Sequence, residues 1–208
     1  CDGVLVDSEP ISITVLVEAL AAAGVAMSEA EAHDRFLGRS LQSMSEILHD
    51  EYGLAIDAAF LDAMRRVLYE RFRAELQPIE GIAETVDGLG IAHCVASSSQ
   101  PERIRLSLSV TGLIDRFEPN IFSASMVAHG KPAPDLYLHA AAALGVPIQR
   151  CVILEDSPVG VTGAVASGAD VIGLCAGSHC GPDHAERLRA LGVKRIAHDF
   201  DEVARLLG

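Results

Sequence analysis

Several short stretches of this sequence combine carboxylates, hydroxyls and a lysine, residue types that can do chemistry together. The residues concerned are Asp2, Ser97, Ser98, Lys131, Glu155 and Asp156. Carboxylate oxygens bind hard divalent cations, a positioned carboxyl group can exchange protons with a substrate, and a lysine offsets negative charge on a bound group. If the fold gathers these side chains in one place, they would hold a cation and an anionic group side by side.

The elements that must position these side chains alternate in type from Pro78 onward. Apolar runs suited to buried strands lie at residues 91–97, 120–123, 151–154, 171–174 and 194–196. Helical patterns lie at residues 81–89, 101–110, 134–145, 158–167, 183–191 and 199–207. Alternating apolar strands and helices indicate a parallel sheet covered on both faces. We therefore predict an α/β fold with a Rossmann-like three-layer α/β/α core.

The candidate residues fall where the predicted strands end. Ser97 ends one strand, Glu155 and Asp156 follow another, and Lys131 lies in the loop after a third. The turn signal at Asp2 is expected to follow a further buried strand. Because ligands bind at the carboxyl ends of the strands in open parallel sheets, these side chains are predicted to converge at one edge.

Residues 11–77 read almost wholly as helix. Helical patterns run over residues 11–23, 28–37 and 40–52, and a long helix begins after Asp57. No strand pattern interrupts them. We therefore predict two domains, a catalytic core of residues 1–10 and 78–208 and an inserted all-helical domain of residues 11–77.

The composition argues against several kinds of partner. The net charge is −13, and nucleic-acid binding rests on neutralising phosphates with lysine and arginine, so no nucleic-acid partner is expected. No apolar run reaches the roughly 18 residues of a membrane span, and the acidic start does not resemble a signal peptide. The five cysteines are scattered and odd in number, which suits a reducing compartment, so we expect a cytoplasmic protein.

One further group of residues hints at a metal site. Cys175, His179 and Cys180 offer sulfur and nitrogen ligands within a short stretch. No second ligand pair is evident nearby in the sequence, so we interpret them as residues of loops and strand ends.

Four motifs resemble, in order and spacing, those of the haloacid-dehalogenase superfamily of phosphohydrolases. The string DGVLVDSE at residues 2–9 is similar to most of the first motif, Asp-x-Asp-Gly-x-x-x-Asp-Ser-Glu. Ser97 matches the second motif, Lys131 in Gly-Lys-Pro-x-Pro the third, and Glu-Asp-Ser-x-x-Gly at residues 155–160 the fourth. The last two forms resemble the subgroup of β-phosphoglucomutase and 6-phosphogluconate-phosphatase-like enzymes, in which a helical cap covers the core.

The resemblance implies phosphoryl transfer assisted by Mg²⁺. The implied metal ligands are Asp156 and the backbone carbonyl of Asp2, with Glu155 in support. Asp2 would also act as general acid and base, and Lys131 would offset charge on the phosphate and the nucleophile. The residues also have structural explanations: a turn at Asp2, a helix cap at Glu155 and Asp156, and a solvated loop lysine at 131.

Phosphate oxygens would be bound by Ser97, the backbone amide of Ser98 and Lys131, as the resemblance implies. The competing explanation for Ser97 is a cap for the helix that follows. Ser99 or Gln100 is better placed for that cap, which would leave Ser97 free.

Two residues of the predicted helical domain also match the family. Arg39, in a stretch that resembles the subgroup's substrate loop, could meet a second anionic group of the substrate, or could be an exposed arginine at a helix start. Glu9 lies where the family has the hinge between core and cap, or it is an acidic residue that favours a helix N-terminus.

The resemblance places the covalent nucleophile, an aspartate, immediately before Cys1. The predicted function is Mg²⁺-dependent hydrolysis of a small sugar phosphate or similar phosphomonoester through an aspartyl-phosphate intermediate, by a monomer or weak dimer. A phosphosugar mutase is an alternative, although mutases of this subgroup need a cap histidine about where Ser12 stands. A catalytically inactive relic that binds phospho-ligands is the alternative if that aspartate is absent.

Overall fold

The computed structural model describes residues 1–36 and 41–208. The chain forms two compact units, one made of Cys1–Asp7 with Leu76–Gly208 and the other of Ser8–Glu75. Each unit has its own cluster of buried apolar residues.

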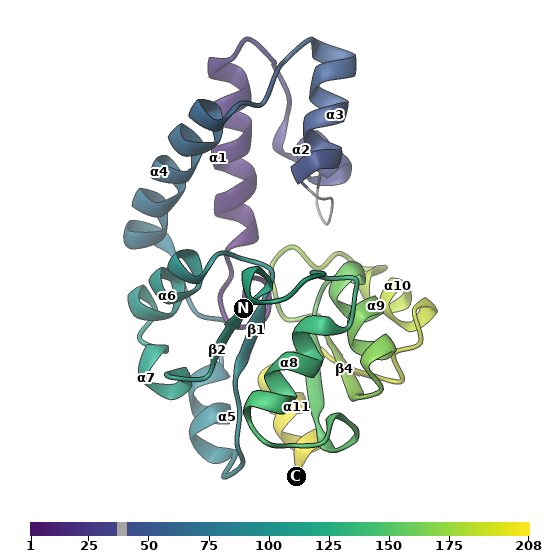
Figure 1. Ribbon diagram of the computed structural model, residues 1–208. Coiled ribbons are helices and arrows are strands. Elements are labelled where there is room, and N and C mark those ends of the chain that lie inside the picture. Colours follow the sequence, from purple (N-terminus) through teal and green to yellow (C-terminus); the bar gives the residue numbers. More distant parts are fainter. Residues whose placement is uncertain (37–40) are drawn as a thin grey trace. The chain divides into compact units, whose positions relative to one another are not determined.

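The unit of residues 8–75 is helical throughout its described part. Its helices are α1 (Glu9–Ala22), α2 (Glu29–Phe36), α3 (Leu41–Tyr52) and α4 (Ala58–Glu75). Helix α1 packs against α2 and α4, and Figure 1 shows α1 and α4 running alongside each other. The side chains of Ser28 and Asp57 accept hydrogen bonds from backbone amides at the starts of α2 and α4, so both residues cap their helices.

The second unit alternates helices with short parallel strands. Its strands are β1 (Val95–Ser97), β2 (Ile121–Ser123), β3 (Val152–Glu155), β4 (Asp170–Leu174) and β5 (Arg195–Ala197). Its α-helices are α5 (Ile82–Gly88), α6 (Pro101–Val110), α7 (Ile114–Phe117), α8 (Asp135–Ala143), α9 (Pro158–Ser167), α10 (His184–Ala190) and α11 (Phe200–Leu207). Two 3-10 helices, η1 (Ala124–Met126) and η2 (Ile148–Arg150), lie in connections. The predicted α/β class with parallel strands is confirmed.

Strand pairing fixes which residues end the strands. β1 pairs in parallel with β2, and Ser97 lies opposite Ser123 at the end of that ladder. β4 lies between β3 and β5, and Glu155, the last residue of β3, lies opposite Gly173. The strand predicted over residues 91–97 begins only at Val95, because its partner β2 is three residues long and the ladder starts there.

The described strands form two separate ladders, and an apolar cavity of about 410 Å³ lies between them. Val95 and Ala96 of β1 line it from one ladder, and Ile153 and Leu154 of β3 line it from the other. Side chains of α5, α8 and α11 and of the first turn also line the cavity. No described strand joins β1 to β3, and the sequence predicts one further strand, which would precede Asp2.

Residues 1–7 form a tight turn against the ladders. Gly3 adopts a φ of 71°, and its backbone amide donates to the carbonyl of Val6 at 2.9 Å. A side chain is strained at this φ, which explains why glycine follows Asp2. Among the described residues, no helix combines the length and apolar character needed to span a membrane.

Candidate active site

Lys131 and Glu155 form a buried ion pair that joins two of the predicted stretches. The lysine Nζ donates to Oε1 of Glu155 and to the backbone carbonyl of Ala96 in β1, the latter at 3.3 Å. The two side chains are only 8% and 6% exposed. The alternative interpretation of Lys131 as a solvated loop lysine is therefore wrong. Its side chain links β1 to β3 through Ala96 and Glu155.

The carboxylate of Glu155 is fully engaged by its neighbours. Besides Lys131, the hydroxyl of Tyr137 donates to Oε1 at 2.7 Å, and Ser157 donates to Oε2 at 3.3 Å. Burial by itself would raise the pKa of Glu155, but Lys131 and Tyr137 hold it below its ordinary value. Glu155 is thus a charged residue whose oxygens orient Lys131. Sequence reasoning missed Tyr137, since nothing in its spacing relates it to Glu155.

The acidic pair does not cap the helix that follows it. Ser157 is the N-cap of α9, and its Oγ accepts from the amide of Gly160 at 3.0 Å. The helix-cap explanation of Glu155 and Asp156 is therefore wrong. Glu155 ends β3 and Asp156 follows it, so both carboxylates lie at the carboxyl end of this strand without capping α9.

Asp156 lies against the first turn of the chain. An ideal Cβ built on Gly3 would fall 2.1 Å from Oδ2 of Asp156, so the backbone beside Asp2 and this carboxylate are in close contact. The same oxygen lies 3.0 Å from Nε2 of His179. The buried carboxylate of Asp156 therefore lies against the backbone of Gly3, the residue next to Asp2.

Two residues that sequence reasoning did not select hold the side chain of Asp2. The hydroxyl of Ser99 donates to Oδ2 at 2.7 Å, and Nη2 of Arg103 donates to Oδ1 at 2.9 Å. Ser99 follows β1 and Arg103 lies in the first turn of α6. Asp2 therefore does more than form a turn, and its carboxylate is oriented from two sides.

Ser97 is buried at the end of β1, and its Oγ accepts from the amide of Ser99 at 3.2 Å. As predicted, Ser97 does not cap the next helix, although its hydroxyl oxygen has a backbone partner in the protein. Gln100 is the N-cap of α6 but makes no side-chain cap bond, and Ser99 bonds to Asp2 instead. The hydroxyl proton of Ser97 can still be donated to a ligand, and Ser98 is exposed beside it.

The remaining candidates lie near or in the helical unit. Glu9 is the first residue of α1, which Ser8 precedes as N-cap without a side-chain bond. Asp7 accepts from the backbone amide and the hydroxyl of Ser178, at 3.2 and 2.9 Å. Arg39 lies outside the described residues.

Helix α9 packs through two glycines against the residues that hold the ion pair. An ideal Cβ on Gly160 would lie 2.1 Å from Oε2 of Glu155. One on Gly163 would lie 2.9 Å from the backbone carbonyl of Ala133, in the loop that carries Lys131. The glycine of the fourth motif is therefore required because no side chain fits beside Glu155.

We expect Gly160→Ala to lower the free energy of unfolding by about 1–3 kcal/mol, the usual cost of overpacking. This loss would outweigh the gain of up to about 1 kcal/mol that alanine brings within a helix. Urea unfolding followed by circular dichroism measures the change. The matched control is Gly88→Ala in α5, where a Cβ meets nothing within 4 Å. Equal stabilities of the two variants would contradict the packing explanation.

The carboxyl ends of these parallel strands carry carboxylates, hydroxyls and a lysine, and open α/β sheets bind ligands at that edge. Residues 1–174 match the family model described as haloacid dehalogenase-like hydrolase. The chain therefore belongs to the haloacid dehalogenase-like hydrolase family, which confirms the resemblance carried by the four motifs.

The similar proteins include one named enzyme and two solved structures. The 6-phosphogluconate phosphatase of Escherichia coli (strain K12) is 29% identical over 183 residues, which cover 88% of this chain and 83% of that protein. A conserved haloacid dehalogenase-like protein of unknown function from Agrobacterium tumefaciens str. C58 is 34% identical, with a TM-score of 0.87, and the match covers 100% of this chain and 94% of that one. A HAD family hydrolase from Deinococcus radiodurans R1, with bound phosphate and sodium, is also 34% identical, with a TM-score of 0.82 and coverage of 99% and 91%.

Proposed function

We propose that this protein is a Mg²⁺-dependent phosphatase that hydrolyses a small sugar phosphate or a similar phosphomonoester. The observation that carries the proposal is the buried Lys131–Glu155 pair, which holds a cationic group at the edge where Asp156 and the first turn meet. The family relationship to 6-phosphogluconate phosphatase supports the reaction class. The bound phosphate of the Deinococcus structure supports an anion site in this fold.

The metal ligands of the proposal are Asp156 and the backbone carbonyl of Asp2. Their fit rests on the close approach of Gly3 to the Asp156 carboxylate, which a single added carbon would block. When bound, Mg²⁺ neutralises charge on the phosphate oxygens and on the attacking group. Glu155, whose oxygens are engaged by Lys131, Tyr137 and Ser157, supports the site by orienting Lys131.

The remaining roles follow from hydrogen-bonding capacity. Lys131 offsets charge on the phosphate, while Ser97 and the amide of Ser98 donate to its oxygens. Asp2, oriented by Ser99 and Arg103, protonates the leaving oxygen and then accepts a proton from the attacking water. This order lets one carboxyl group serve both halves of the reaction.

The nucleophile of the proposal is an aspartate immediately before Cys1, which forms the aspartyl-phosphate. The apolar cavity between β1 and β3 supports this placement, because a strand inserted there would join the two ladders and end beside Asp2. Its backbone groups would pair with β1 and β3, whose facing edges have no strand partner among the described residues.

The helical unit of residues 8–75 is proposed to act as a cap that covers a small substrate. Glu9 and Arg39 are its proposed substrate contacts, and Arg39 suits a second anionic group such as a carboxylate. Hydrolysis is preferred over phosphosugar mutation because Ser12 stands where the subgroup's mutases need a histidine. The hydroxyl of Ser12 donates to the carbonyl of Ser8 at 2.9 Å, and it offers no group that titrates near neutral pH.

The proposal is tested with protein that includes an aspartate immediately before Cys1. Release of phosphate from p-nitrophenyl phosphate and from a panel of phosphorylated sugars and sugar acids is measured with Mg²⁺ and again with excess EDTA. We expect hydrolysis that EDTA abolishes and added Mg²⁺ restores. Interconversion of sugar 1- and 6-phosphates without phosphate release would indicate a mutase. Binding of phosphate esters without either reaction would indicate a relic and would overturn the proposal.

A further inference from the structure

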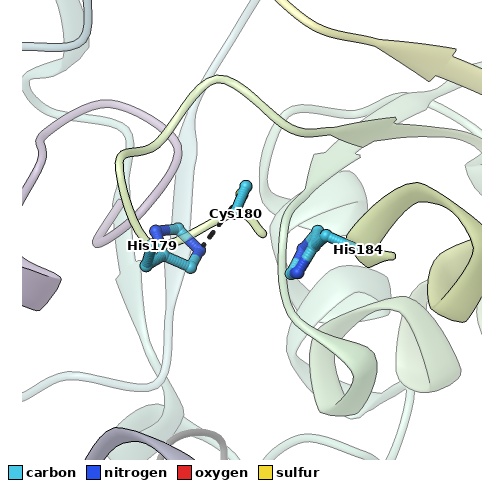
Figure 2. A group of neighbouring side chains, drawn as sticks. All are labelled: His179, Cys180 and His184. Carbon is cyan, nitrogen blue, oxygen red and sulfur yellow. Dashed lines mark hydrogen bonds between the residues drawn. The ribbon is translucent and has the colours of Figure 1, made fainter. Parts of the chain in front are cut away.

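A second set of ligand atoms lies beside the proposed magnesium site, and its chemistry is different. His179, Cys180 and His184 bring two imidazoles and one thiol together, with ligand atoms that all lie within 4.8 Å of one another. Figure 2 shows these three side chains, which we call the His–Cys–His cluster. Cys175, His179 and Cys180 alone do not indicate a metal site, because no second ligand pair is evident near them in the sequence. The structure adds His184, the first residue of α10.

The separations within the cluster suit a small ion held by nitrogen and sulfur. Nε2 of His179 lies 3.5 Å from Sγ of Cys180. Zinc–nitrogen bonds of about 2.0–2.1 Å and zinc–sulfur bonds of about 2.3 Å, at tetrahedral angles, separate those atoms by about 3.5 Å. All other separations of ligand atoms in the cluster are within 4.8 Å, so each must shorten by at most about 1.3 Å for the atoms to bind the same ion.

The bonds around His184 favour its use as a ligand. Its Nε2 lies 2.6 Å from the backbone carbonyl of Asp156, and a carbonyl only accepts, so Nε2 carries the proton. In the neutral ring the lone pair is then on Nδ1, which lies 3.3 Å from Nη2 of Arg187. A ligand histidine typically donates its other ring N–H to a backbone carbonyl or a carboxylate, which fixes the ring. Metal binding requires Arg187 to release Nδ1.

The cluster also offers a thiol and a buried ring nitrogen that is unsatisfied among the described residues. Nδ1 of His179 is buried and has no hydrogen-bond partner among the described residues. A thiolate is the form of cysteine that binds metals.

We propose that His179, Cys180 and His184 form a binding site for Zn²⁺, with a fourth position open to water. Nitrogen and sulfur ligands suit zinc, whereas the oxygen ligands proposed around Asp156 suit magnesium. The two sites share one contact, because Nε2 of His179 also lies 3.0 Å from Oδ2 of Asp156. His179 cannot donate a proton to Asp156 and bind zinc through the same nitrogen, so zinc releases Asp156 from this bond.

Cobalt titration of metal-free, reduced protein tests the site without any measurement of phosphatase activity. We expect Co²⁺ to produce thiolate-to-cobalt charge-transfer absorption and the visible bands of a tetrahedral ion, and Zn²⁺ to displace it. Cys180→Ser should abolish the charge-transfer band, and His184→Gln should weaken binding about 10- to 100-fold or more. Cys151→Ser is the matched control and should change nothing, since Cys151 lies outside the cluster.

Alkylation of the unaltered protein provides a second measurement if a variant fails to fold. Zn²⁺ should protect Cys180 from iodoacetamide while leaving the reactivity of Cys151 unchanged, as mapped by mass spectrometry. Absence of a charge-transfer band, its retention in Cys180→Ser, or alkylation of Cys180 at an unchanged rate in Zn²⁺ would each overturn the proposal. None of these outcomes depends on whether the protein is a phosphatase.

Discussion

Replacing Lys131 with methionine should lower kcat for phosphate ester hydrolysis by about 10²–10³-fold, the usual effect of removing one preorganised electrostatic contact. Methionine keeps much of the side-chain volume but cannot donate to Glu155 or to a phosphate oxygen. Steady-state kinetics of protein that includes the aspartate expected before Cys1 would measure the loss. Lys194→Met is the matched control, because Lys194 is exposed and should be dispensable.

The same substitution should destabilise the fold, since Glu155 would keep its charge in a buried place without its cationic partner. Breaking a buried ion pair costs about 3–5 kcal/mol. The double variant Lys131→Met with Glu155→Gln removes both charges and should recover most of that stability while remaining inactive. Recovery of both stability and activity in the double variant would show that Lys131 serves the fold and not the reaction.

Asp2→Asn should lower kcat by about 10²–10⁴-fold. It should also lower the free energy of unfolding by about 1–3 kcal/mol, because one of the two donors to Asp2 loses its charged acceptor. An asparagine oxygen can still accept from Ser99 or Arg103, so the side chain should stay in place. It cannot carry a proton to the leaving oxygen, which is the contribution expected of a general acid. Hydrolysis of esters with good leaving groups should suffer least, because those need no protonation.

The matched control for Asp2 is Asp87→Asn, since Asp87 also pairs with an arginine but in an exposed place. Arg116 donates to both of its carboxylate oxygens, at 2.8 and 2.7 Å, and lowers the pKa of Asp87 through these bonds. Loss of this surface pair should leave kcat unchanged. If Asp2→Asn and Asp87→Asn had the same activity, Asp2 would be a structural residue only.

Much of the fold could be predicted because local signals determine it. Proline sets the first residue of α6 and of α9, and both helices span the residues expected from the sequence. Strand length is less local, because β1 is limited by the three residues of its partner β2. No described strand lies between the two ladders, and the further strand expected before Asp2 stays a prediction.

The candidate site shows the same division. The strand-end rule places Ser97 and Glu155 at strand ends, and the structure has them there. The atoms that these residues contact depend on how each helix is rotated about its axis and on the course of each loop. The spacing of apolar residues in the sequence does not determine either. Arg103 reaches Asp2 only because of where the first turn of α6 lies. His184 of the His–Cys–His cluster could not be found in this way, because it lies in the next helix, outside residues 175–180.

The glycine-lined face of α9 has a consequence for how the ion pair keeps its geometry. Gly160 and Gly163 are three positions apart on one side of the helix, where residues of that spacing are neighbours. One touches the carboxylate of Glu155, and the other touches the main chain of the loop that carries Lys131. The one helix α9 therefore contacts both sides of the Lys131–Glu155 ion pair. A small displacement of α9 would therefore move Glu155 and the loop of Lys131 in the same direction. The distance between the two side chains would then change little when other parts of the protein move.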